Sequence, residues 1–553
     1  MSASVRRRSG PAGRYTPKGR QVETAALEQV RALLGDAPRR RDLLIEHLHL
    51  IQDAHGHISA RHLAALAQEM RLSQAEVYEV ATFYAHFVVT AEGETPPPPL
   101  TVRVCDGIAC EMAGAKGLID GLKAALGNGV RLVPAPCVGA CDRAPVAVVG
   151  QRPVDRADVD AVKAAVEAGD VIPPIPPAQD IDTYRSKDGG YTVLAECLSG
   201  KRDPDGVTGD LEASGLRGLG GAGFPAARKW GFVKANPGPR IVAVNADEGE
   251  PGTLKDRYCL ETRPHRTLEG ALIAAWAVGA DAIYIYLRDE YPWLRPVLRK
   301  AIDEVTAAGI APGISIHLRR GAGAYICGEE SAMLESLEGK RGLPRNRPPF
   351  PAQAGLFGRP TLIHNVETLY WVPDILLKGP LWYQNAGRPH HYSVSGRVRN
   401  PGVLTAPSGV SVNDLIARCG GMAEGHTLKG FLPGGASGGI LPADKADLSL
   451  DFGHLEQYGC FVGSSAVVVL SDQDSITDVV GNLLRFFAEE SCGQCTPCRL
   501  GCEKMLDLLD APDPDMDLVR ELADVMRDAS ICGLGQAAPN PVLSALRFFS
   551  EEM

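Results

Sequence analysis

The stretch RIVAVNADEGEPGTLKDR, residues 240–257, decides the fold of the largest part of this 553-residue chain. Its start, RIVAVN, is a short apolar run typical of a buried strand, and the acidic and glycine-rich residues after it indicate a loop. A second apolar run, DAIYIYL at 281–287, follows a helical segment. Because strands alternate with helices here, we predict a mostly parallel sheet with helices packed on it over residues 191–387.

Polar side chains follow the strand at 240–245, in the region where sheets of this class bind ligands. They are Asn245, Asp247, Glu248 and Glu250. Paired carboxylates suit acid–base hydrolysis or Mg²⁺ binding, and they suit equally the acceptance of hydrogen bonds from ribityl hydroxyls, ribose and a carboxamide. The residues alone leave these alternatives open.

A glycine-rich segment, RGLGGAGFPAARKW at 217–230, precedes this strand and contains Gly218, Gly220 and Gly223 at GxGxxG spacing. The Rossmann form of this motif needs a strand directly before it, and EASGLR is not a strand. Glycines still let backbone N–H groups approach a phosphate, and Lys229 could reach a phosphate or a flavin edge. A plain glycine-rich turn is the alternative.

A third segment, residues 320–368, adds Gly328, Glu329 and Glu330 and then a loop rich in proline and phenylalanine. Phe350 in that loop could offer a flat surface to a nicotinamide or adenine ring.

Two cysteine clusters account for eight of the fourteen cysteines. The first is Cys105-x4-Cys110 with Cys137-x3-Cys141, each pair ending a predicted strand and entering a loop. Zinc sites usually have two-residue gaps between paired cysteines, whereas gaps of four and three suit a 2Fe–2S cluster better. We therefore favour 2Fe–2S, with zinc and redox-active thiols as the alternatives.

The second cluster is Cys492-x2-Cys495-x2-Cys498, which can hold three corners of a 4Fe–4S cubane. In bacterial ferredoxins the fourth cysteine of such a run serves a second cluster and precedes proline, but Glu503 follows Cys502 here. We predict Cys532 as the fourth ligand and keep Cys502, a buried thiol in this interpretation, as the alternative. The cysteines at 197, 259, 327, 419, 460 and 502 are interpreted as buried apolar residues.

Composition shifts and proline-rich linkers divide the chain. We predict the following regions: 1–22 disordered tail; 23–92 helical bundle; 99–172 thioredoxin-like 2Fe–2S domain; 173–190 linker; 191–387 α/β domain; 388–462 β-grasp-like domain; 463–553 helical 4Fe–4S domain. A transit peptide is the alternative for the arginine-rich start. Ser59 and Ser73 are expected N-caps, the latter in a capping box with Glu76. The segment at 74–86 resembles a recognition helix but carries no Lys or Arg, which argues against DNA binding.

Overall composition is that of an ordinary globular protein, with 45% apolar and 22% charged residues and a net charge of −10. The charge gives no broad electrostatic case for nucleic acid. We find neither a membrane span nor an export signal, so we expect a cytoplasmic protein in a reducing compartment. Clustered cysteines there point to metal rather than to disulfides.

Five motifs, in order, resemble the NADH-oxidising flavoprotein subunit of respiratory complex I. They are GLGGAGFPAARKW, NADEGEPGTLKDR, RGAGAYICGEESAMLESLEGKRG, PPFPAQAGLFGRPTLIHNVETL and ESCGQCTPCR with SICGLG. Residues 20–170, with CDGIAC and PCVGAC, resemble the neighbouring subunit with a thioredoxin-like 2Fe–2S ferredoxin. The resemblance implies one fused diaphorase with FMN, NAD(H), one 2Fe–2S and one 4Fe–4S cluster. Hydride transfer would be the work of FMN, with no catalytic acid or base.

The resemblance also implies roles for individual residues. FMN is expected on Gly218, Gly220, Gly221, Gly223, Lys229, Asn245, Asp247, Glu248, Gly328, Glu329, His364 and Asn365. NAD(H) is expected against Phe224, Phe232 and Phe350, with Glu250 and Glu330 as supporting contacts and Arg347 nearby. Two positions depart from the family pattern: Arg347 replaces the usual Lys before PPFP, and His364 replaces the first Asn of an Asn-Asn pair. Both replacements can still donate hydrogen bonds.

Three assemblies use such a unit: complex I, NAD-reducing hydrogenases, and NAD-dependent formate dehydrogenases with a molybdenum or tungsten catalytic subunit. The segments KWGFVKANPGPR, DRYCLETRPHRTLEG and VGSSAVVVL resemble the formate dehydrogenase beta subunit most. We therefore expect a molybdenum- or tungsten-pterin alpha subunit with iron–sulfur clusters as partner, with hydrogenase and complex I as alternatives. A zinc-stabilised scaffold without redox chemistry is the rival hypothesis from another class.

Overall fold

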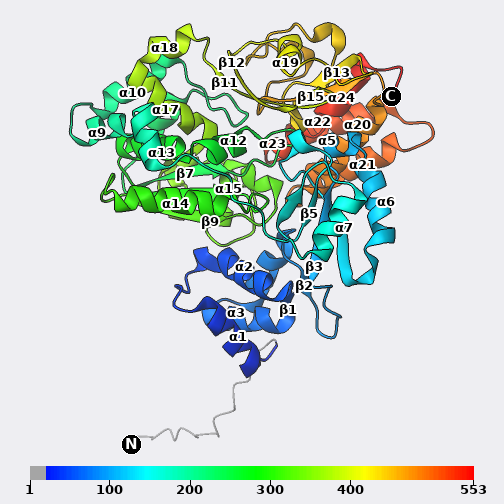
Figure 1. The fold of residues 1–553 in the computed structure, drawn as a ribbon, viewed down its shortest axis with the longest axis horizontal. Helices are drawn as coiled ribbons and strands as arrows, with labels where there is room; N and C mark the ends of the chain where they lie inside the picture. Colours follow the sequence, from blue (N-terminus) through cyan, green and yellow to red (C-terminus); the bar gives the residue numbers. More distant parts are fainter. Residues whose placement is uncertain (1–19) are drawn as a thin grey trace, which may run out of the picture.

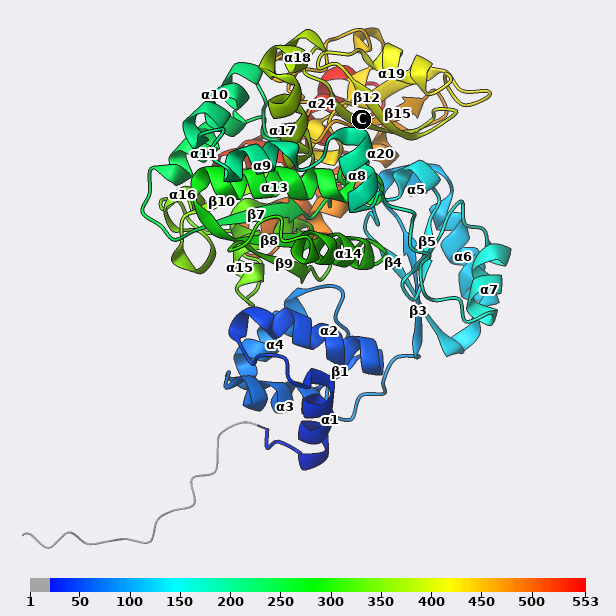
Figure 2. The ribbon, with the colours of Figure 1, turned by 60° about the vertical axis from the view of Figure 1, so that its left-hand side comes forward.

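The computed structural model of the protein describes residues 20–553 (Figure 1, Figure 2). Most of the tail predicted at 1–22 lies outside the described residues. The N-terminal helices form a separate group below the main sheet in both views, and the last helices lie beside the domain that contains β3–β6. The predicted multidomain α/β fold class is confirmed: within residues 20–553 there are four sheets, and helices surround them.

The first region is helical, with one short strand pair. Its elements are α1 (Thr24–Leu34), α2 (Leu44–His55), β1 (Ile58–Ser59), α3 (Ala60–Met70), α4 (Gln74–Phe83) and β2 (Val89–Thr90). Both predicted N-caps are present: the Ser59 hydroxyl accepts from the His62 N–H, and Ser73 forms a capping box with Glu76. Apolar residues of this region belong to one core with residues of β7, β8 and the last helices, so the bundle is docked rather than free.

The second region is a four-stranded sheet with the order β4-β3-β5-β6, with helices packed against it. Its elements are β3 (Leu100–Cys105), α5 (Ile108–Met112), α6 (Ala115–Ala125), β4 (Val130–Ala135), β5 (Ala147–Val149), β6 (Arg152–Val154) and α7 (Val159–Glu167). Strands β3 and β4 are parallel neighbours, with Cys105 opposite Ala135. Their carboxyl ends therefore lie together, and the loops with the first four cysteines start from the same edge.

The third region contains the stretch 240–257 and forms a four-stranded parallel sheet with the order β10-β7-β8-β9. Its strands are β7 (Arg240–Ala246), β8 (Ala280–Leu287), β9 (Ser315–Arg320) and β10 (Thr361–Asn365). Its helices are α8 (Ile181–Asp188), α9 (Thr192–Leu198), α10 (Pro204–Ser214), α11 (Ala226–Lys234), α12 (Lys255–Thr262), α13 (Pro264–Val278), α14 (Leu294–Ala307), α15 (Glu330–Leu337), α16 (Pro351–Ala354), α17 (Val366–Lys378) and α18 (Pro380–Asn385). All four strands end at one edge.

The fourth region is a five-stranded mixed sheet with the order β12-β11-β15-β13-β14. Its elements are β11 (His390–Gly396), β12 (Gly402–Ala406), α19 (Val412–Arg418), β13 (Leu428–Leu432), β14 (Leu441–Pro442) and β15 (Ala466–Ser471). Strand β15 lies in the middle of this sheet, whereas the sequence places residues from 463 onward in the helical domain. All six residues of β15 are buried, and a fully buried strand carries no polar–apolar alternation that would reveal its sheet.

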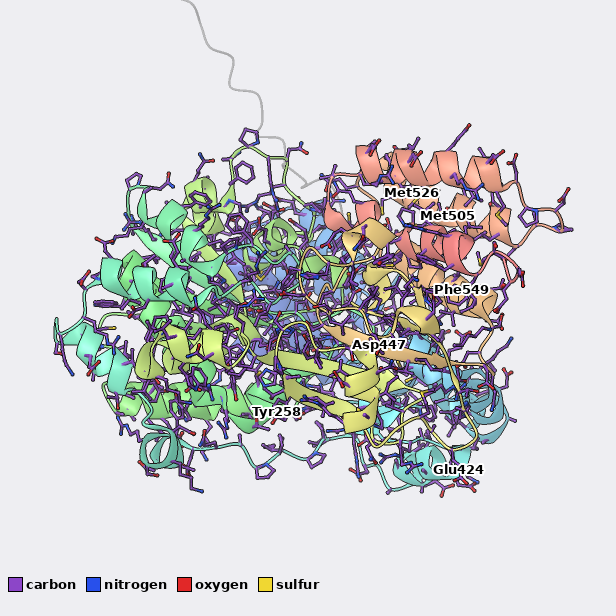
Figure 3. All side chains as sticks on the ribbon, turned by 90° about the horizontal axis from the view of Figure 1, so that it is seen from above. Tyr258, Glu424, Asp447, Met505, Met526 and Phe549 are labelled. Atoms are coloured by element: carbon purple, nitrogen blue, oxygen red, sulfur yellow. The ribbon has the colours of Figure 1, made fainter. Side chains whose placement is uncertain are left out.

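The last region is helical: α20 (Ile476–Glu489), α21 (Thr496–Leu509), α22 (Met516–Ala529), α23 (Gly533–Ala537) and α24 (Asn540–Phe548). Met505 of α21 and Met526 of α22 belong to its core (Figure 3). None of the helices formed by residues 20–553 combines the length and the apolar character that crossing a bilayer requires.

Candidate functional site

Three segments predicted to contact cofactor meet at the carboxyl edge of the parallel sheet. Asn245 and Asn365 are register partners at the ends of the neighbouring strands β7 and β10. The Asn245 side-chain amide donates to the backbone carbonyl of Gly328 at 2.8 Å, which fixes the turn before α15 at the same edge. Residues separated by more than a hundred positions thus share one site because their strands are parallel.

The glycine-rich loop lies against the N-terminus of α17. The Leu219 N–H donates to the Thr368 hydroxyl at 2.9 Å, and the side-chain oxygen of Asn365 caps the helix by accepting from the Thr368 N–H at 3.0 Å. A Cβ at Gly220 would lie 3.0 Å from the Cβ of Asn365, so an added methyl group would press on Asn365. Gly220 is exposed, and a glycine loop beside a helix N-terminus fits a phosphate such as that of FMN.

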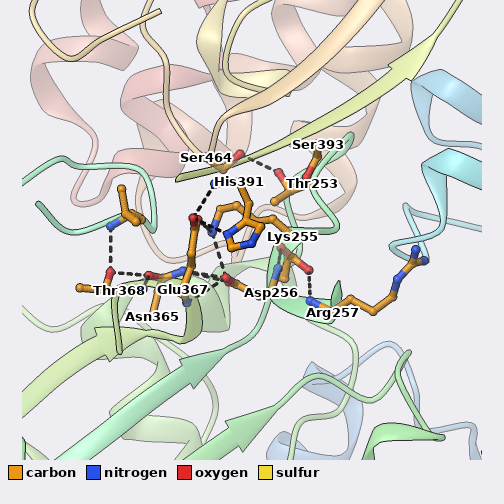
Figure 4. A network of polar contacts seen from close by, with 12 residues as sticks. Thr253, Lys255, Asp256, Arg257, Asn365, Glu367, Thr368, His391, Ser393 and Ser464 are labelled. Atoms are coloured by element: carbon orange, nitrogen blue, oxygen red, sulfur yellow. Dashed lines mark hydrogen bonds and ion pairs between the residues drawn. The ribbon is translucent and has the colours of Figure 1, made fainter. Parts of the chain in front are cut away.

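A buried ionic network lies next to this helix N-terminus and contacts Asn365, the residue that caps the helix (Figure 4). The Asn365 amide donates to both carboxylate oxygens of Asp256, at 3.0 and 2.9 Å. Lys255, only 1% exposed, pairs with Asp256 at 2.9 Å and with Glu367 at 3.1 Å, and Glu367 in turn contacts His391. Burial alone would lower the pKa of Lys255, but the two carboxylates raise it above its ordinary value.

Sequence reasoning missed this network. Glu367 and His391 lie more than a hundred positions after Lys255 in the sequence. No local sequence pattern predicts an ion pair over that separation. The run Lys255-Asp256-Arg257 lies in a segment rich in charged residues, which by itself is typical of a solvent-exposed surface.

The carboxylates after β7 have three different environments. One oxygen of Asp247 is buried and has no hydrogen-bond partner among the described residues, and burial raises the pKa of this carboxyl. Glu248 accepts from the N–H groups of Asp256 and Arg257, at 2.7 and 3.0 Å, and from the Tyr291 hydroxyl at 3.1 Å. Burial raises the pKa of Glu248 to about 7. The orphaned acceptor of Asp247 fits a ligand hydroxyl, whereas the Glu248 carboxylate already caps α12.

Glu250, the third of these carboxylates, faces the five-stranded sheet. It accepts from the backbone N–H and the hydroxyl of Ser437, each at 2.7 Å, and from the Tyr325 hydroxyl. Burial raises its pKa. These bonds hold the carboxylate in place.

Charged side chains surround the mouth of the site. Lys229 lies 3.4 Å from Glu330, and Arg347 lies 2.7 Å from Glu329 and 3.0 Å from Glu330. Glu329 also caps α15 by accepting from two backbone N–H groups in the first turn of that helix. Arg347 is therefore held at the mouth of the site by two carboxylates.

Three phenylalanines near this mouth are unusually exposed: Phe224 at 38%, Phe232 at 55% and Phe350 at 51%. The rings of Phe224 and Phe232 are 6.1 Å apart, and the Arg347 guanidinium lies 5.9 Å from the ring of Phe350. Exposed aromatic faces beside charged groups suit a flat heteroaromatic ring.

His364 is placed differently from the expectation. Its Nε2 accepts from the Trp230 indole N–H at 2.9 Å, and the ring is buried. Burial, with a contribution from Lys229, lowers the pKa of His364 to about 3. The ring is therefore neutral, and only Nδ1 is left to donate toward a ligand.

The first four cysteines are brought together and buried. The sulfurs of Cys137 and Cys141 are 3.3 Å apart, and Cys105 hydrogen-bonds to Cys110 and Cys137. Bonds from the neighbouring thiols lower the pKa of Cys137 well below its usual value, with a smaller contribution from the Arg288 charge. Four converging thiols of which one is readily ionised fit a metal cluster.

Two arginines of the parallel-sheet region hold this cysteine loop. Arg257 donates to the Gly139 carbonyl at 2.7 Å and to both Asp142 carboxylate oxygens at 2.9 Å. Arg288 donates to the Cys137 carbonyl at 2.7 Å. Cys137 and Asp247 also line one small cavity, so the cluster adjoins the edge of the sheet.

The second cysteine group lies at the start of α21 and of α23. Cys492 and Cys495 are in the loop before α21, Cys498 is in its first turn, and Cys532 is the N-cap of α23. Burial raises the pKa of Cys532 to about 12, with smaller contributions from the charges of Cys492 and Glu329. The Tyr325 N–H, in the turn before Glu329, donates to the Glu490 carboxylate at 2.8 Å, so the segment that leads to Cys492 lies beside this turn.

Cys502 lies one turn beyond Cys498 and is fully buried in the core of the last helices. Its thiol hydrogen-bonds to Cys498, which lowers the pKa of Cys498 to about 7. This environment suits a packing thiol. Cys105, Cys110, Cys137 and Cys141 adjoin one another, and Cys492, Cys495, Cys498 and Cys532 lie at the starts of two neighbouring helices; all eight stay predicted ligands.

Four family models match the chain. They are the Nuo51 FMN-binding domain at residues 211–374, the thioredoxin-like [2Fe-2S] ferredoxin at 30–169, the NADH-ubiquinone oxidoreductase-F iron-sulfur binding region at 478–553, and the SLBB domain at 392–441. The chain thus combines an FMN-binding domain, a 2Fe–2S domain and a 4Fe–4S region, with NAD(H) as the substrate of the flavoprotein. The zinc-scaffold hypothesis finds no support in these matches.

Among curated proteins, an F-type subunit of the NADH-quinone oxidoreductase of Rhizobium meliloti (strain 1021) is 40% identical over 399 residues, which are 68% of this chain and 94% of the relative. The mitochondrial NADH dehydrogenase [ubiquinone] flavoprotein 1 of Dictyostelium discoideum is 41% identical over 374 residues, 63% of this chain and 78% of the relative. Crystal structures of NAD+-reducing [NiFe]-hydrogenase match nearly end to end. The H2-reduced state has a TM-score of 0.81 at 32% identity, covering 93% of this chain and 92% of that one.

Proposed function

Because the chain belongs to the family of NADH-quinone oxidoreductase flavoproteins, we propose that it is the diaphorase subunit of a cytoplasmic NAD-dependent formate dehydrogenase. In this proposal it exchanges electrons between NAD(H) and a molybdenum- or tungsten-pterin catalytic subunit. The observation that supports the diaphorase role most directly is the meeting of three features at one sheet edge. They are a glycine loop beside a helix N-terminus, exposed aromatic rings, and contacts with both cysteine-bearing regions.

FMN, when bound, supplies the chemistry that joins two-electron hydride exchange with NAD(H) to one-electron exchange with iron–sulfur clusters. The chain's own residues provide position and environment. The loop at Gly220 and the N-terminus of α17 would hold the phosphate, with Lys229 adding positive charge. The orphaned oxygen of Asp247 would accept a hydrogen bond from a ribityl hydroxyl.

The dinucleotide would stack at the mouth of the site. Phe224, Phe232 and Phe350 offer the apolar faces, and Glu330 lies among the charged groups around them. Stacked rings displace water from the reacting face, which favours hydride transfer over side reactions. No side chain is required to take up or give a proton in this step, in keeping with the absence of an acid or base from the predicted roles.

The formate assignment is supported by the resemblance of three segments, at 229–240, 256–270 and 462–470, to formate dehydrogenase beta subunits. The test is to purify the complex formed by the tagged chain. We expect a brown assembly with FMN, iron, acid-labile sulfide and molybdenum or tungsten, with formate:NAD⁺ activity. The chain alone should oxidise NADH with artificial acceptors and leave formate untouched. Formate turnover by the isolated chain would contradict the proposal.

A hydrogenase partner is the second candidate, and one observation favours it. The NAD+-reducing [NiFe]-hydrogenase chains match over 92% or more of both lengths, whereas the Rhizobium meliloti relative matches only 68% of this chain. A copurified subunit containing nickel, with H2:NAD⁺ activity and no formate turnover, would select this candidate. The metal content of the partner therefore separates the two.

A further inference from the structure

A cluster of two histidines and one aspartate lies where the N-terminal helices meet the parallel sheet, apart from every residue predicted to hold a cofactor. His49 and Asp53 stand one turn apart on α2, and His86 follows α4. One ligand atom from each of the three residues lies within 4.8 Å of the other two. His49 is only 2% exposed.

The hydrogen bonds of the two rings define which nitrogens carry lone pairs. Nε2 of His49 lies 2.8 Å from the backbone carbonyl of Gly321, which can only accept, so this nitrogen carries the hydrogen and Nδ1 the lone pair. Nδ1 of His86 lies 2.6 Å from the Asp289 carboxylate, which orients that ring in the same way and leaves the lone pair on Nε2. This is the arrangement that carbonyls and carboxylates impose on metal-binding histidines.

The two lone-pair nitrogens, Nδ1 of His49 and Nε2 of His86, are both buried and have no hydrogen-bond partner among residues 20–553. Other buried ring nitrogens share this property, for example Nδ1 of His47. What distinguishes this pair is that one nitrogen of each ring and one Asp53 carboxylate oxygen lie within 4.8 Å of one another, around a common point. A cation at that point would satisfy both at once.

The surrounding charges are compatible with a cation. Arg320 lies 2.6 Å from Asp53 and 2.5 Å from Asp289, so two carboxylates share one guanidinium. The two carboxylates and the one guanidinium carry a net formal charge of about −1, which a divalent cation bound by the two imidazoles would reverse to about +1.

We propose that His49, Asp53 and His86 bind one divalent transition-metal ion, with zinc as the best match to two imidazoles and a carboxylate. A metal with ligand bonds of about 2.0–2.2 Å would draw the three atoms closer than their present separation. His86 also lines a cavity of about 250 Å³ together with Asp289 and Gly323. Water from this cavity can supply the fourth ligand and a path for entry.

A metal ion bound at this site would hold two regions of the chain together. His49 and Asp53 belong to the N-terminal helices, whereas Asp289, Arg320 and Gly321 lie at the ends of the strands β8 and β9. The backbone of His86 is tied to the same edge, because its N–H donates to the carbonyl of residue 322 at 3.2 Å. Metal binding there would fix the N-terminal helices on the flavoprotein region.

The test is to incubate the purified holoprotein with one equivalent of ZnCl2, remove free metal, and determine zinc and iron together by elemental analysis. We expect about one zinc per chain in the wild type, with iron unchanged at about six per chain for one 2Fe–2S and one 4Fe–4S cluster. His49→Gln and Asp53→Asn should each reduce retained zinc at least about tenfold. Asp53 is exposed, and Arg320 keeps its ion pair with Asp289 when Asp53 is substituted, so we expect Asp53→Asn to fold.

His55→Gln is the matched control, because His55 lies on the same helix and is exposed. It should retain zinc like the wild type. Zinc K-edge absorption should give a first shell of nitrogen and oxygen. The proposal is overturned by a wild type that retains no zinc, by equal zinc in the His49 and His55 variants, or by a sulfur shell with loss of iron, which would place the zinc on the cysteines. Another divalent metal that the same two substitutions remove would support it.

Discussion

At the scale of the residue, Gly220 is the position where a single Cβ decides whether the cofactor cradle can form. The hypothetical Cβ comes within 3.0 Å of Asn365, whose side chain is fixed by the cap of α17 and by Asp256. The neighbour cannot move without losing those bonds. Glycine is favoured at position 220 because the side chain of Asn365, at the N-terminus of α17, leaves little room for a Cβ atom.

We expect Gly220→Ala to weaken FMN binding at least about tenfold, or about 1.4 kcal/mol, because the loop must withdraw from the N-terminus of α17. The measurement is the dissociation constant of FMN from quenching of its fluorescence. Gly231→Ala on α11 is the control, since nothing lies within 4 Å of its added Cβ. Equal affinity in the two variants would show that the close approach at Gly220 has no bearing on FMN.

His364 gives a prediction of pH dependence. Its pKa in the folded protein is about 3, below the ordinary value of 6.5, so the unfolded chain binds the proton more readily. Stability from this residue is therefore complete above pH 6.5 and is lost as the pH falls toward 3. At pH 5 the loss has an upper limit of about 2 kcal/mol.

His364→Gln keeps an acceptor for Trp230 but does not titrate. We expect its thermal midpoint to fall less between pH 7 and pH 5 than that of the wild type, even if it starts lower. His454→Gln, at an exposed position, should keep the wild-type slope. A His364 variant with an unchanged slope would refute the assignment of a neutral, buried ring.

At the scale of the element, strand β8 and helix α12 determine how the first cysteine loop is docked. Arg288 follows β8 and Arg257 lies on α12, and both donate to backbone carbonyls of the segment 137–139. The positive charge of Arg288 also acts on Cys137. Strand β8 and helix α12 therefore fix the position of the first cysteine loop, and the Arg288 charge makes the electrostatic potential at Cys137 more positive.

Arg288→Gln should lower the reduction potential of the 2Fe–2S cluster by an amount on the order of tens of millivolts, because a nearby positive charge stabilises the reduced form. Redox titration followed by electron paramagnetic resonance measures this. Arg295→Gln is the control, since Arg295 also bridges the two regions, through Gln151, without acting on a predicted cluster ligand. An unchanged potential in Arg288→Gln would contradict the electrostatic role.

At the scale of the whole molecule, the sheet edge lies between the two cysteine groups. Cys137 shares a small cavity with Asp247, whereas the Tyr325 N–H, in the turn before α15, donates to Glu490 near the second cysteine group at 2.8 Å. The last helices also contact the first cysteine region directly, because the side chain of residue 482 donates to the carbonyl of residue 106 at 2.8 Å. The fused chain thus keeps both groups close to one cofactor site without a partner.

Cys532→Ala should remove the 4Fe–4S cluster, and with it about four of six irons, while FMN remains reducible by NADH. In the complex, transfer to the partner should fall to background. Cys502→Ala is the control and should retain all iron, because Cys502 packs in the helical core. If instead Cys502→Ala loses the cluster and Cys532→Ala keeps it, the ligand assignment is reversed. Iron analysis and NADH bleaching of the flavin absorbance measure both variants.

The sequence by itself determined features that depend on short spacing. The cysteine gaps predicted cluster chemistry, the runs at 240–245 and 281–287 predicted strands, and Ser73 with Glu76 predicted a capping box, all within one element or loop. Only the tertiary structure decided the pairing of β15, the ionic network around Lys255, and the meeting of His49 with His86. Whether two distant segments bury each other or form an ion pair depends on which surfaces the folded chain brings into contact. Local sequence patterns do not indicate those contacts.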